Sequence, residues 1–356
     1  MAPPSSSVSS PWHAHLTIDL LAYVASYTVF HPFVAWIFPL SLRAQGTPYH
    51  FPSFLVSVAH ASLVSAFHLF SLINKRLAYG PPRPINLNDE VIVITGGAGG
   101  LGLLIAEVYG MRGASVAVLD VAEIKEAEAR GINYYHCDVG DATSVEKAAE
   151  QIKQDLGTPT IIINNAGIVN GKNLLDLSPS DVERNFRVNL LSHFYTIRQF
   201  LPGMMSSPTG GTIVTVSSVL GKIGAAKLSD YTAAKAGLIA MHTSLIGELR
   251  HSPDLGAKNI RTILVTPGQL ATPLFGTMAT PSNFFGPVVE PVQVANEIIK
   301  MVDAGEGGEL SFPLYACFMD WMNVLPAALQ RAARAMSQID TAMRNFRGER
   351  NEKQGK

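Results

Sequence analysis

The sequence predicts an α/β protein in which a parallel β-sheet is covered by helices on both faces. Three observations predict it. From residue 90 onward, short β-branched runs alternate with helical segments, a glycine-rich loop joins the first run to the first helix, and polar residues stand at the ends of several runs. Strands that alternate with helices form parallel sheets with right-handed crossovers. Ligands bind outside the carboxyl ends of such strands, so we expect the chemistry there.

The strands are predicted from runs of β-branched residues and the helices from the longer segments between them. Together they make a doubly wound sheet of about seven strands. The predicted strands are 91–95, 115–120, 132–136, 160–164, 212–217, 260–266 and 309–312. The predicted helices are 101–111, 122–130, 143–156, 180–204, 230–250 and 291–304.

The part of the chain before this domain is strongly hydrophobic. Residues 1–11 are rich in Ser and Pro, and we expect them to be disordered. Two mostly apolar stretches follow, 16–40 and 51–73, and each is long enough to cross a hydrocarbon core of about 30 Å. We predict N-terminal hydrophobic helices that act as a membrane anchor: two spans, a hairpin inserted from one face, or one span beside an interfacial helix. The alternative is that one or both helices are buried in a soluble protein.

The charges that flank these stretches predict the orientation. Lys75, Arg76 and Arg83 follow the second stretch, whereas no Lys or Arg precedes the first. Basic residues favour the cytoplasmic side, so we expect the α/β domain to face the cytoplasm. No basic region precedes the first stretch, so a cleaved signal peptide is not expected. Because Pro81-Pro82-Arg83-Pro84 predicts a stiff linker, we divide the chain into a disordered tip, anchor and linker at 1–83, an α/β domain at 84–315 and an amphipathic extension at 316–356.

Composition narrows the classes of partner. Only 15% of the 356 residues are charged, against about 25% in ordinary soluble proteins, which indicates that part of the chain meets lipid or a large partner. The formal net charge is −1 and no basic stripe is present, so nucleic acid is not an expected partner. Cys137 and Cys317 do not form a disulfide framework and favour a reducing compartment. No metal-ligand spacing is found, so no metal is expected.

The first predicted strand ends in Thr95-Gly96-Gly97-Ala98-Gly99-Gly100-Leu101-Gly102 and leads directly into a helix. Glycines let the backbone turn tightly and approach a pyrophosphate, and the helix N-terminus offers free N–H groups. Such a loop is weak evidence by itself, but its position between a strand and a helix is the context that supports a nucleotide site.

Asp120 ends the second predicted strand, 18 residues after Gly102. A carboxylate at this place accepts hydrogen bonds from an adenosine ribose and repels a 2′-phosphate, which favours NAD over NADP. No Lys or Arg lies in the glycine loop or directly after Asp120 to hold such a phosphate. The alternative is that Asp120 only caps a helix before Ala122.

Tyr231 and Lys235 are four residues apart on a predicted helix and therefore share a face. A nearby ammonium favours the tyrosinate and lowers the phenol pKa from about 10, so the tyrosine can exchange a proton with a substrate oxygen. Ser218 lies 13 residues before Tyr231, just past a predicted strand, where a parallel sheet presents side chains to a ligand. Adjacent strand residues point to opposite faces, which leaves Ser217 as the alternative to Ser218.

With these residues in place, the sequence resembles the short-chain dehydrogenase/reductase family. The glycine loop, Asn164-Asn165-Ala166-Gly167, Asn189, the set of Ser218, Tyr231 and Lys235, and Pro267-Gly268 occur in that family's order over roughly residues 88–315. The resemblance implies a Rossmann-type fold, a nicotinamide dinucleotide cofactor and oxidoreductase activity on CH–OH groups.

The resemblance also implies the role of each residue. Ser218 would polarise the substrate oxygen, and Tyr231 would be the general acid/base. Lys235 would lower the pKa of Tyr231 and bind the nicotinamide ribose. Asn189 would position a water on the proton path to Lys235, or be merely structural. The implied cofactor contacts are Thr95, Gly96, Gly100, Leu101, Gly102, Asp120, Asp138, Val139, Asn165, Ala166, Gly167, Tyr231, Lys235, Pro267, Gly268 and Thr272. Among these, Asp138 and Val139 would contact adenine and Thr272 the carboxamide. Cys137, His193 and His242 are assigned no chemistry.

Within the family, the chain is similar to the membrane-associated retinol dehydrogenases and the lipid-droplet 17β-hydroxysteroid dehydrogenases. The stretches 181–204, 322–326 and 336–346 carry this similarity. It implies a retinoid, steroid or fatty-alcohol-like substrate, a location at the endoplasmic reticulum or lipid droplets, and a homodimer as one option. That subgroup has one N-terminal hydrophobic region, so the two stretches here are a departure.

Two segments are candidates for contact with a lipophilic substrate. Residues 270–289 are expected to form a mobile apolar lid, or only to pack on the domain; their apolar residues are Leu274, Phe275, Met278, Phe284, Phe285 and Val288. Residues 314–346 are expected to form amphipathic helices against the membrane or the substrate entrance, with a dimer contact or a core role as alternatives.

Two other functions remain open from the sequence. One is an NADPH-dependent reductase of a long-chain keto lipid, against which Asp120 argues. The other is a catalytically silent membrane or lipid-droplet scaffold protein, against which the complete set of Asn189, Ser218, Tyr231 and Lys235 argues.

Overall fold

The computed structural model describes residues 16–275, 278, 282–344 and 346. The segment predicted to be disordered, 1–11, and parts of the predicted lid and C-terminal extension lie outside the described residues. Contacts divide the chain into two compact units, Met1–Leu77 with Ser282–Pro287, and Ala78–Pro281 with Val288–Lys356.

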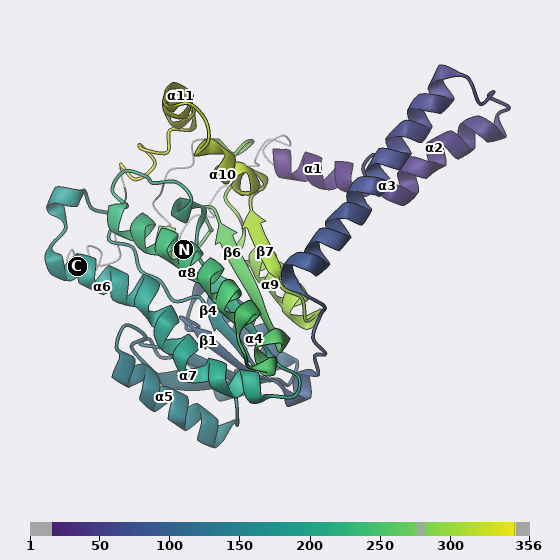
Figure 1. The fold of residues 1–356 in the computed structure, drawn as a ribbon. Coiled ribbons are helices and arrows are strands. Elements are labelled where there is room, and N and C mark those ends of the chain that lie inside the picture. Colours follow the sequence, from purple (N-terminus) through teal and green to yellow (C-terminus); the bar gives the residue numbers. More distant parts are fainter. Residues whose placement is uncertain (1–15, 276–277, 279–281, 345, 347–356) are drawn as a thin grey trace, which may run out of the picture. The chain divides into compact units, whose positions relative to one another are not determined.

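A seven-stranded parallel sheet forms the centre of the second unit, in the order β3-β2-β1-β4-β5-β6-β7 (Figure 1). The chain winds outward from β1 in one direction and then from β4 in the other, so the strand order reverses between these two neighbours. The predicted α/β fold class is therefore confirmed. The strands are β1 (Val91–Thr95), β2 (Ser115–Asp120), β3 (Ile132–His136), β4 (Ile161–Asn164), β5 (Gly211–Val216), β6 (Ile260–Pro267) and β7 (Gly308–Phe312).

Helices cover both faces of the sheet. The helices α4 (Gly100–Met111) and α9 (Pro291–Asp303) pack on one face, against a core that includes Ile92 and Ile94. The other face carries α5 (Ala142–Asp155), α7 (Ser192–Ser206) and α8 (Ser229–His251). Successive residues of β1 enter different cores because strand side chains alternate between faces. A sheet buried on both sides needs apolar residues at nearly every position, which explains the Val/Ile-rich runs.

One predicted helix is absent from the described structure. Residues 122–130 have a helical composition, but only the short 3₁₀-helix η3 (Glu128–Arg130) forms there. The backbone N–H of Ala122 donates to the Asp120 carboxylate at 2.9 Å, which turns the chain directly after β2. Ile124 is buried in the core that contains α4 and α9. Tertiary packing of this segment thus overrides its helix propensity.

The predicted helix 180–204 is interrupted in its middle. It consists of α6 (Pro179–Phe186), the π-helical turn η5 (Arg187–Leu191) and α7. Ser178 and Asp181 form a capping box that starts α6. A π-turn inserts an extra residue and changes which side chains face the sheet, and such turns frequently mark functional sites.

The C-terminal extension consists of the short helices η9 (Leu314–Phe318) and α10 (Met319–Met322), followed by α11 (Ala327–Ser337). Gln338 has a φ of 52° and ends α11, so the chain reverses after it. The remaining 3₁₀-helices are η2 (Leu87–Asp89), η4 (Leu174–Asp176), η6 (Val219–Gly221), η7 (Leu255–Asn259) and η8 (Pro273–Phe275).

The first unit contains α1 (Ile18–Tyr27), α2 (Pro32–Ala44) and most of α3 (Pro52–Tyr79). Among the described residues, α3 is the one helix long and apolar enough to cross a membrane. The bent pair of α1 and α2, which meet at 57°, passes the same test as one broken span. The break falls before Pro32. A proline disfavours the helical backbone conformation at the preceding residue, and it is favourable at the first position of a new helix.

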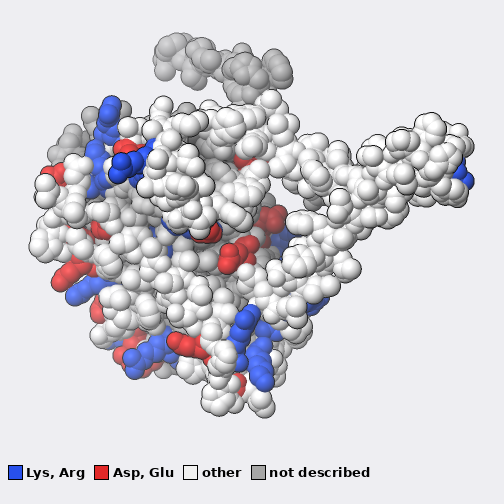
Figure 2. Space-filling model, turned by 45° about the horizontal axis from the view of Figure 1, so that its top comes forward, with Lys and Arg blue, Asp and Glu red and all other residues white. Residues whose placement is uncertain are grey.

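The helices α2 and α3 pack closely against each other. Ala35 and Ala61 are fully buried, and the Trp36 indole N–H donates to the Ser65 hydroxyl at 3.0 Å. Between Leu16 and Asn74 only Asp19 and Arg43 are charged. In the view of Figure 2, Lys, Arg, Asp and Glu gather on the surface of the second unit. The first unit therefore has an apolar surface of the kind that lipid accommodates.

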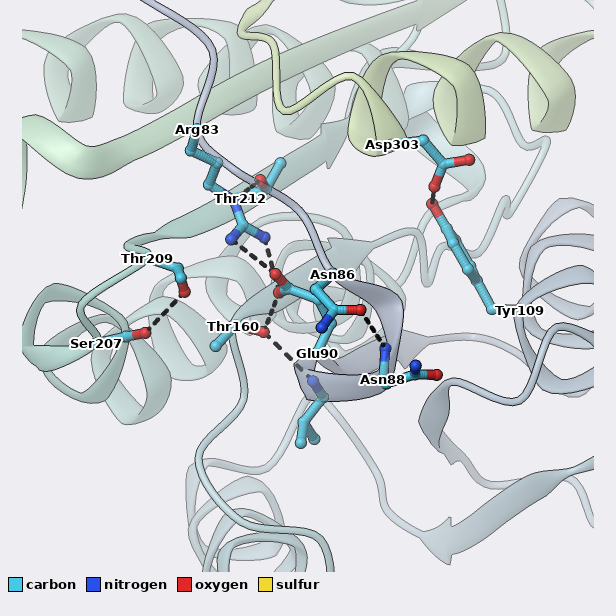
Figure 3. Close-up of polar contacts among 11 residues, drawn as sticks. Arg83, Asn86, Asn88, Glu90, Tyr109, Thr160, Ser207, Thr209, Thr212 and Asp303 are labelled. Atoms are coloured by element: carbon cyan, nitrogen blue, oxygen red, sulfur yellow. Dashed lines mark hydrogen bonds and ion pairs between the residues drawn. The ribbon is translucent and has the colours of Figure 1, made fainter.

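The linker that precedes the sheet is fixed by a buried ion pair (Figure 3). The Arg83 guanidinium donates both terminal nitrogens to the Glu90 carboxylate, at 2.9 and 2.8 Å, and its Nε to the Thr212 hydroxyl at 2.9 Å. The Thr160 hydroxyl also donates to Glu90. Thr160 precedes β4 and Thr212 belongs to β5, so this cluster lies at the amino ends of the strands. It leaves the carboxyl ends open for the site.

Candidate active site

The glycine loop lies between β1 and α4 and is held by the neighbouring strand. The Asn165 side-chain amide donates to the carbonyl oxygens of Thr95 and Gly96, at 3.2 and 3.0 Å. Gly96 has a φ of +65°, in the region that glycine adopts without strain. A Cβ on Gly102 would lie 2.7 Å from the Asn165 side-chain nitrogen, so the packing of α4 against this loop requires glycine there.

The start of α4 has the properties of an anion site. Gly99 is its N-cap residue and has no side chain to bond the first N–H groups, and the first turn contains no acidic residue. The N–H groups of a first helical turn lack partners within the helix and carry a partial positive charge. The loop therefore fits the pyrophosphate of a dinucleotide.

Asp120 stands at the carboxyl end of β2 and is tied to the same loop. Its carboxylate accepts from the backbone N–H of Ala98 at 2.9 Å and from that of Ala122 at 2.9 Å. The second bond is the one expected of a capping residue, but no helix begins there, so the interpretation of Asp120 as a helix cap is wrong. A carboxylate has about four acceptor positions, and two of them remain for a ribose hydroxyl.

A cavity of about 460 Å³ extends along the carboxyl ends of the strands. Most of the predicted site residues line it: Gly96, Gly100, Leu101, Asp120, Asp138, Val139, Asn165, Ala166, Gly167, Ser218, Tyr231, Lys235, Pro267, Gly268 and Thr272. Three predicted residues do not line it: Thr95, Gly102 and Asn189. Thr95 and Gly102 are the two ends of the glycine loop, and Thr95 Oγ1 accepts from the N–H groups of Asn165 and Ala166 at 3.0 and 3.1 Å.

Sequence reasoning missed several residues that line the cavity, among them Ile168, Arg184 and Val188. Arg184 and Val188 are four residues apart, on α6 and the following π-turn, and so share a face. That spacing could have singled them out, but no motif marks them. Among the described residues that line the cavity, the cations are Arg184 and Lys235.

Ser218, Tyr231 and Lys235 meet at the end of β5. The Ser218 hydroxyl accepts from the Leu220 N–H at 3.1 Å and donates weakly to the Pro267 carbonyl at 3.4 Å. The Lys235 ammonium donates to the Val216 carbonyl at 2.9 Å and lies 5.8 Å from the centre of the Tyr231 ring. The three side chains are buried and therefore shielded from bulk water.

The two adjacent serines have different partners. The Ser217 hydroxyl donates to the backbone carbonyl of Lys235 at 2.9 Å and so supports the position of α8. The hydrogen bond of Ser218 with Tyr231 lowers the pKa of the phenol. Ser218, and not Ser217, is therefore the serine that interacts with Tyr231.

The pKa of Tyr231 differs in direction from the shift that the sequence predicts. Burial raises the pKa of Tyr231 above its usual value, and the hydrogen bond with Ser218 opposes this only in part. Burial also lowers the pKa of Lys235 to about 7, because a buried ammonium loses its hydration. Desolvation is thus the largest influence on the pKa of Tyr231.

Asn189 is held beside the cavity by the π-turn. Its side-chain oxygen accepts from the Ile168 N–H at 2.9 Å, and its side-chain nitrogen donates to the Ile168 carbonyl and to Asn185 Oδ1, each at 2.9 Å. Its amide therefore uses both donors and one acceptor position, and the two bonds to Ile168 position the segment that follows Gly167. In this structure the Asn189 side chain has a structural role, and its predicted part in the proton path stays a prediction.

Two buried histidines lie outside the cavity lining. Burial lowers the pKa of His193 well below its usual value and that of His242 to about 4, and the His242 ring contacts the Thr215 hydroxyl at 3.0 Å. Over the residues that the structure describes, no cluster of three or more His, Cys, Asp or Glu side chains is placed to hold a metal.

Comparison with known proteins identifies the family. A model of the short chain dehydrogenase family matches residues 90–282. The chain is 32% identical to Epidermal retinol dehydrogenase 2 of Mus musculus, over 70% of this chain and 78% of that protein. It is 32% identical to the uncharacterized oxidoreductase TDA5 of Saccharomyces cerevisiae, over 72% and 78%, and 29% identical to Estradiol 17-beta-dehydrogenase 11 of Pongo abelii, over 62% and 73%.

A solved structure has the same fold. The ligand-free aldohexose dehydrogenase of Thermoplasma acidophilum superposes with a TM-score of 0.54 at 25% identity, over 64% of this chain and 93% of that one.

Proposed function

Because this chain belongs to the short-chain dehydrogenase family, we propose that it transfers a hydride between NAD(H) and the alcohol or carbonyl group of an apolar substrate. The family and the fold imply a nicotinamide dinucleotide cofactor and an oxidoreductase that acts on alcohols. One observation carries the finer proposal: Asp120, the glycine loop and Tyr231 all line one cavity.

The residues that line the cavity indicate which part of the cofactor each end of the site would hold. The free N–H groups at the start of α4 would hold the pyrophosphate, and Asp120 would accept from the adenosine ribose. Asp138 and Val139 would border the adenine, and Lys235 and Thr272 would reach the nicotinamide end. The preference for NAD(H) rests on the carboxylate of Asp120, which would repel a 2′-phosphate.

The proposed chemistry uses Ser218, Tyr231 and Lys235. The hydride chemistry would be supplied by a bound nicotinamide cofactor, oxidised for alcohol oxidation and reduced for carbonyl reduction. For alcohol oxidation, Ser218 would hold the substrate oxygen and Tyr231, as the tyrosinate, would accept the hydroxyl proton. For carbonyl reduction, the same phenol would donate its proton. Lys235, whose buried ammonium is within reach of the Tyr231 ring face, would stabilise the tyrosinate.

We further propose that the helices of the first unit anchor the enzyme in a membrane, with the second unit on the cytoplasmic side. The support is the length and apolar surface of α3, and the basic residues Lys75 and Arg76 at its end. The endoplasmic reticulum and lipid droplets are the proposed locations.

A retinoid, a steroid or a fatty alcohol is the proposed class of substrate, and a homodimer is the proposed assembly. Retinol and estradiol dehydrogenases among the relatives support this class.

A fluorescence titration of the purified protein with NADH and with NADPH tests the core of the proposal. Tighter binding of NADH is expected, and oxidation of an apolar alcohol should follow in a panel of retinol, steroids and fatty alcohols. Tighter binding of NADPH would contradict the role given to Asp120. Binding of neither would contradict the enzymatic function itself.

A further inference from the structure

Two faces of α6 and the π-turn that follows it have different surroundings. Asn185 and Asn189 face the segment at Ile168, because the Asn189 amide bonds both the Ile168 backbone and the Asn185 side chain. Arg184 and Val188 each lie one residue earlier and line the cavity. Residues four apart share a helix face. This face therefore presents one cationic and one apolar side chain to the cavity.

The face that carries Arg184 belongs to the adenosine end of the cavity. A Cβ built on Gly140 would lie 3.2 Å from Val188 Cγ2 and 3.2 Å from Asp138 Oδ1. Val188 is thus beside the loop after β3, in which Asp138 and Val139 line the same cavity. These two residues would border the adenine in the proposed site. Arg184, one turn before Val188, is placed next to the adenosine.

The charges at this end of the cavity are unbalanced without Arg184. Asp120 and Asp138 both line it. The Lys235 ammonium lies at the other end, where it donates to the carbonyl of Val216, the last residue of β5, at 2.9 Å. Among the described lining residues, Arg184 is therefore the cation at the adenosine end. A dinucleotide brings the negative charges of its pyrophosphate close to the two carboxylates, and a cation there offsets the repulsion.

The Arg184 guanidinium is available to a ligand. The residue is exposed, and among the described residues none forms an ion pair or a hydrogen bond with its guanidinium. Arg83, Arg112 and Arg130, by contrast, pair with carboxylates. A guanidinium has five N–H donors in a planar arrangement that matches two oxygens of a phosphate.

We propose that Arg184 is a further cofactor-binding residue, whose guanidinium pairs with the adenosine 5′-phosphate of the bound dinucleotide. The inference rests on the proposed dehydrogenase function and adds a binding residue to it. The pyrophosphate is held by two helices: the N–H groups of the first turn of α4 and the side chain of Arg184 on α6. Val188, one turn later, provides an apolar contact for the adenosine.

The test compares Arg184→Gln with Arg187→Gln in the full-length, detergent-solubilised protein. Arg187 is the matched control, because it is exposed, carries the same charge three residues away and does not line the cavity. The Kd for NADH is measured by fluorescence titration. At about 50 mM salt it should rise about fivefold in Arg184→Gln and stay within about twofold in Arg187→Gln. At about 500 mM salt the difference between Arg184→Gln and the wild type should shrink, since salt screens an exposed ion pair.

Competition against NADH by adenosine, 5′-AMP and 2′-AMP identifies the group that Arg184 contacts. In Arg184→Gln, the inhibition constant of 5′-AMP should rise about fivefold, while that of adenosine stays within about twofold. A loss for 2′-AMP alone would assign Arg184 to a 2′-phosphate, and an equal loss for adenosine would assign it to the base or the sugar. Either result overturns the pairing with the 5′-phosphate.

Arg184→Lys should recover part of the affinity for NADH, because it restores the charge but not the planar pair of donors. An unchanged Kd for NADH in Arg184→Gln, or an equal rise in Arg187→Gln, removes Arg184 from the cofactor site. Failure of the proposed function gives a different result: the wild-type protein then binds neither NADH nor NADPH.

Discussion

The carboxylate of Asp120 accepts a hydrogen bond from the backbone N–H of Ala98 at 2.9 Å, so the end of β2 is tied directly to the glycine loop. One side chain thus supports the loop that would hold the pyrophosphate and carries the charge that would exclude a 2′-phosphate. The two contributions can be separated by substitution.

Asp120→Asn and Asp120→Ala should differ in their effects on cofactor binding. The amide keeps an acceptor for the Ala98 N–H but loses the charge, so NADPH should bind about tenfold more tightly and NADH a few-fold more weakly. The alanine variant also loses the support of the loop, and both cofactors should bind more weakly than in the asparagine variant. Fluorescence titration measures these constants. Unchanged discrimination in both variants would contradict the role of Asp120.

Tyr231→Phe should abolish turnover and leave the Kd for NADH within about twofold. The phenylalanine ring keeps the buried packing but cannot exchange a proton, and such a loss costs about 10²–10⁴-fold in rate. Tyr195→Phe is the control, because Tyr195 lies on α7 and does not line the cavity. Comparable activity of the two variants would contradict the assignment of the acid/base.

The rate of alcohol oxidation should rise with pH into the alkaline range. Oxidation requires the tyrosinate, and burial raises the pKa of Tyr231, so the reactive form becomes more abundant only as pH increases above the usual range of a phenol. Carbonyl reduction requires the protonated phenol and should show the opposite slope. A kcat/KM profile measured in both directions checks this. An oxidation rate that is flat above neutral pH would contradict a raised pKa.

Acid should destabilise the fold through the buried His242. Its pKa is lowered to about 4 in the native state and is near 6.5 when unfolded, so the unfolded chain binds more protons between these values. The free energy of unfolding should therefore fall as pH falls from about 6.5 towards 4. Urea unfolding at several pH values, compared with His242→Gln, measures this contribution. An identical pH slope in the variant would assign the effect to other groups.

Arg83→Ala should lower the free energy of unfolding by about 3–5 kcal/mol, because it leaves the Glu90 charge buried without its partner. Arg130→Ala should cost less than about 1 kcal/mol, since its pair with Glu107 is exposed to solvent. Chemical denaturation of both variants makes the comparison. The Kd for NADH should not change in either, because the Arg83 cluster lies at the amino ends of the strands.

Removal of residues 1–80 should release the protein from membranes while NADH binding survives. The Arg83–Glu90 pair is retained in this variant, so the ion pair that holds the start of the sheet in place remains. Removal of residues 1–15 alone should leave the protein in the membrane fraction. If the 1–80 deletion still sediments with membranes and binds NADH, the C-terminal extension must be the main anchor.

Much of the fold and the site could be predicted from the sequence. The strand runs, the loop from Thr95 to Gly102 and the spacing of Ser218, Tyr231 and Lys235 depend on local patterns, because a strand, a turn or a helix face is specified by residues close together in the chain. The predicted fold class and family are confirmed for this reason. The roles of the individual site residues stay predictions that the geometry of the cavity supports.

Other features arise only when distant segments pack. Residues 122–130 have helical propensity, yet the burial of Ile124 and the turn at Asp120 prevent a helix. The predicted lid is divided in the structure: Leu274 packs near Tyr231, whereas Phe284 accepts a backbone hydrogen bond from Ile18 in the first unit.

The sequence by itself therefore determined the order of the strands, the glycine loop and the spacing of Ser218, Tyr231 and Lys235. Tertiary structure alone decided that the π-turn places Asn189 beside Ile168, that burial controls the pKa of Tyr231, and that Met343 lies near Tyr231 although 112 residues separate them. The physical reason is that local patterns encode conformation over a few residues, whereas burial and proximity depend on which remote side chains share the same core.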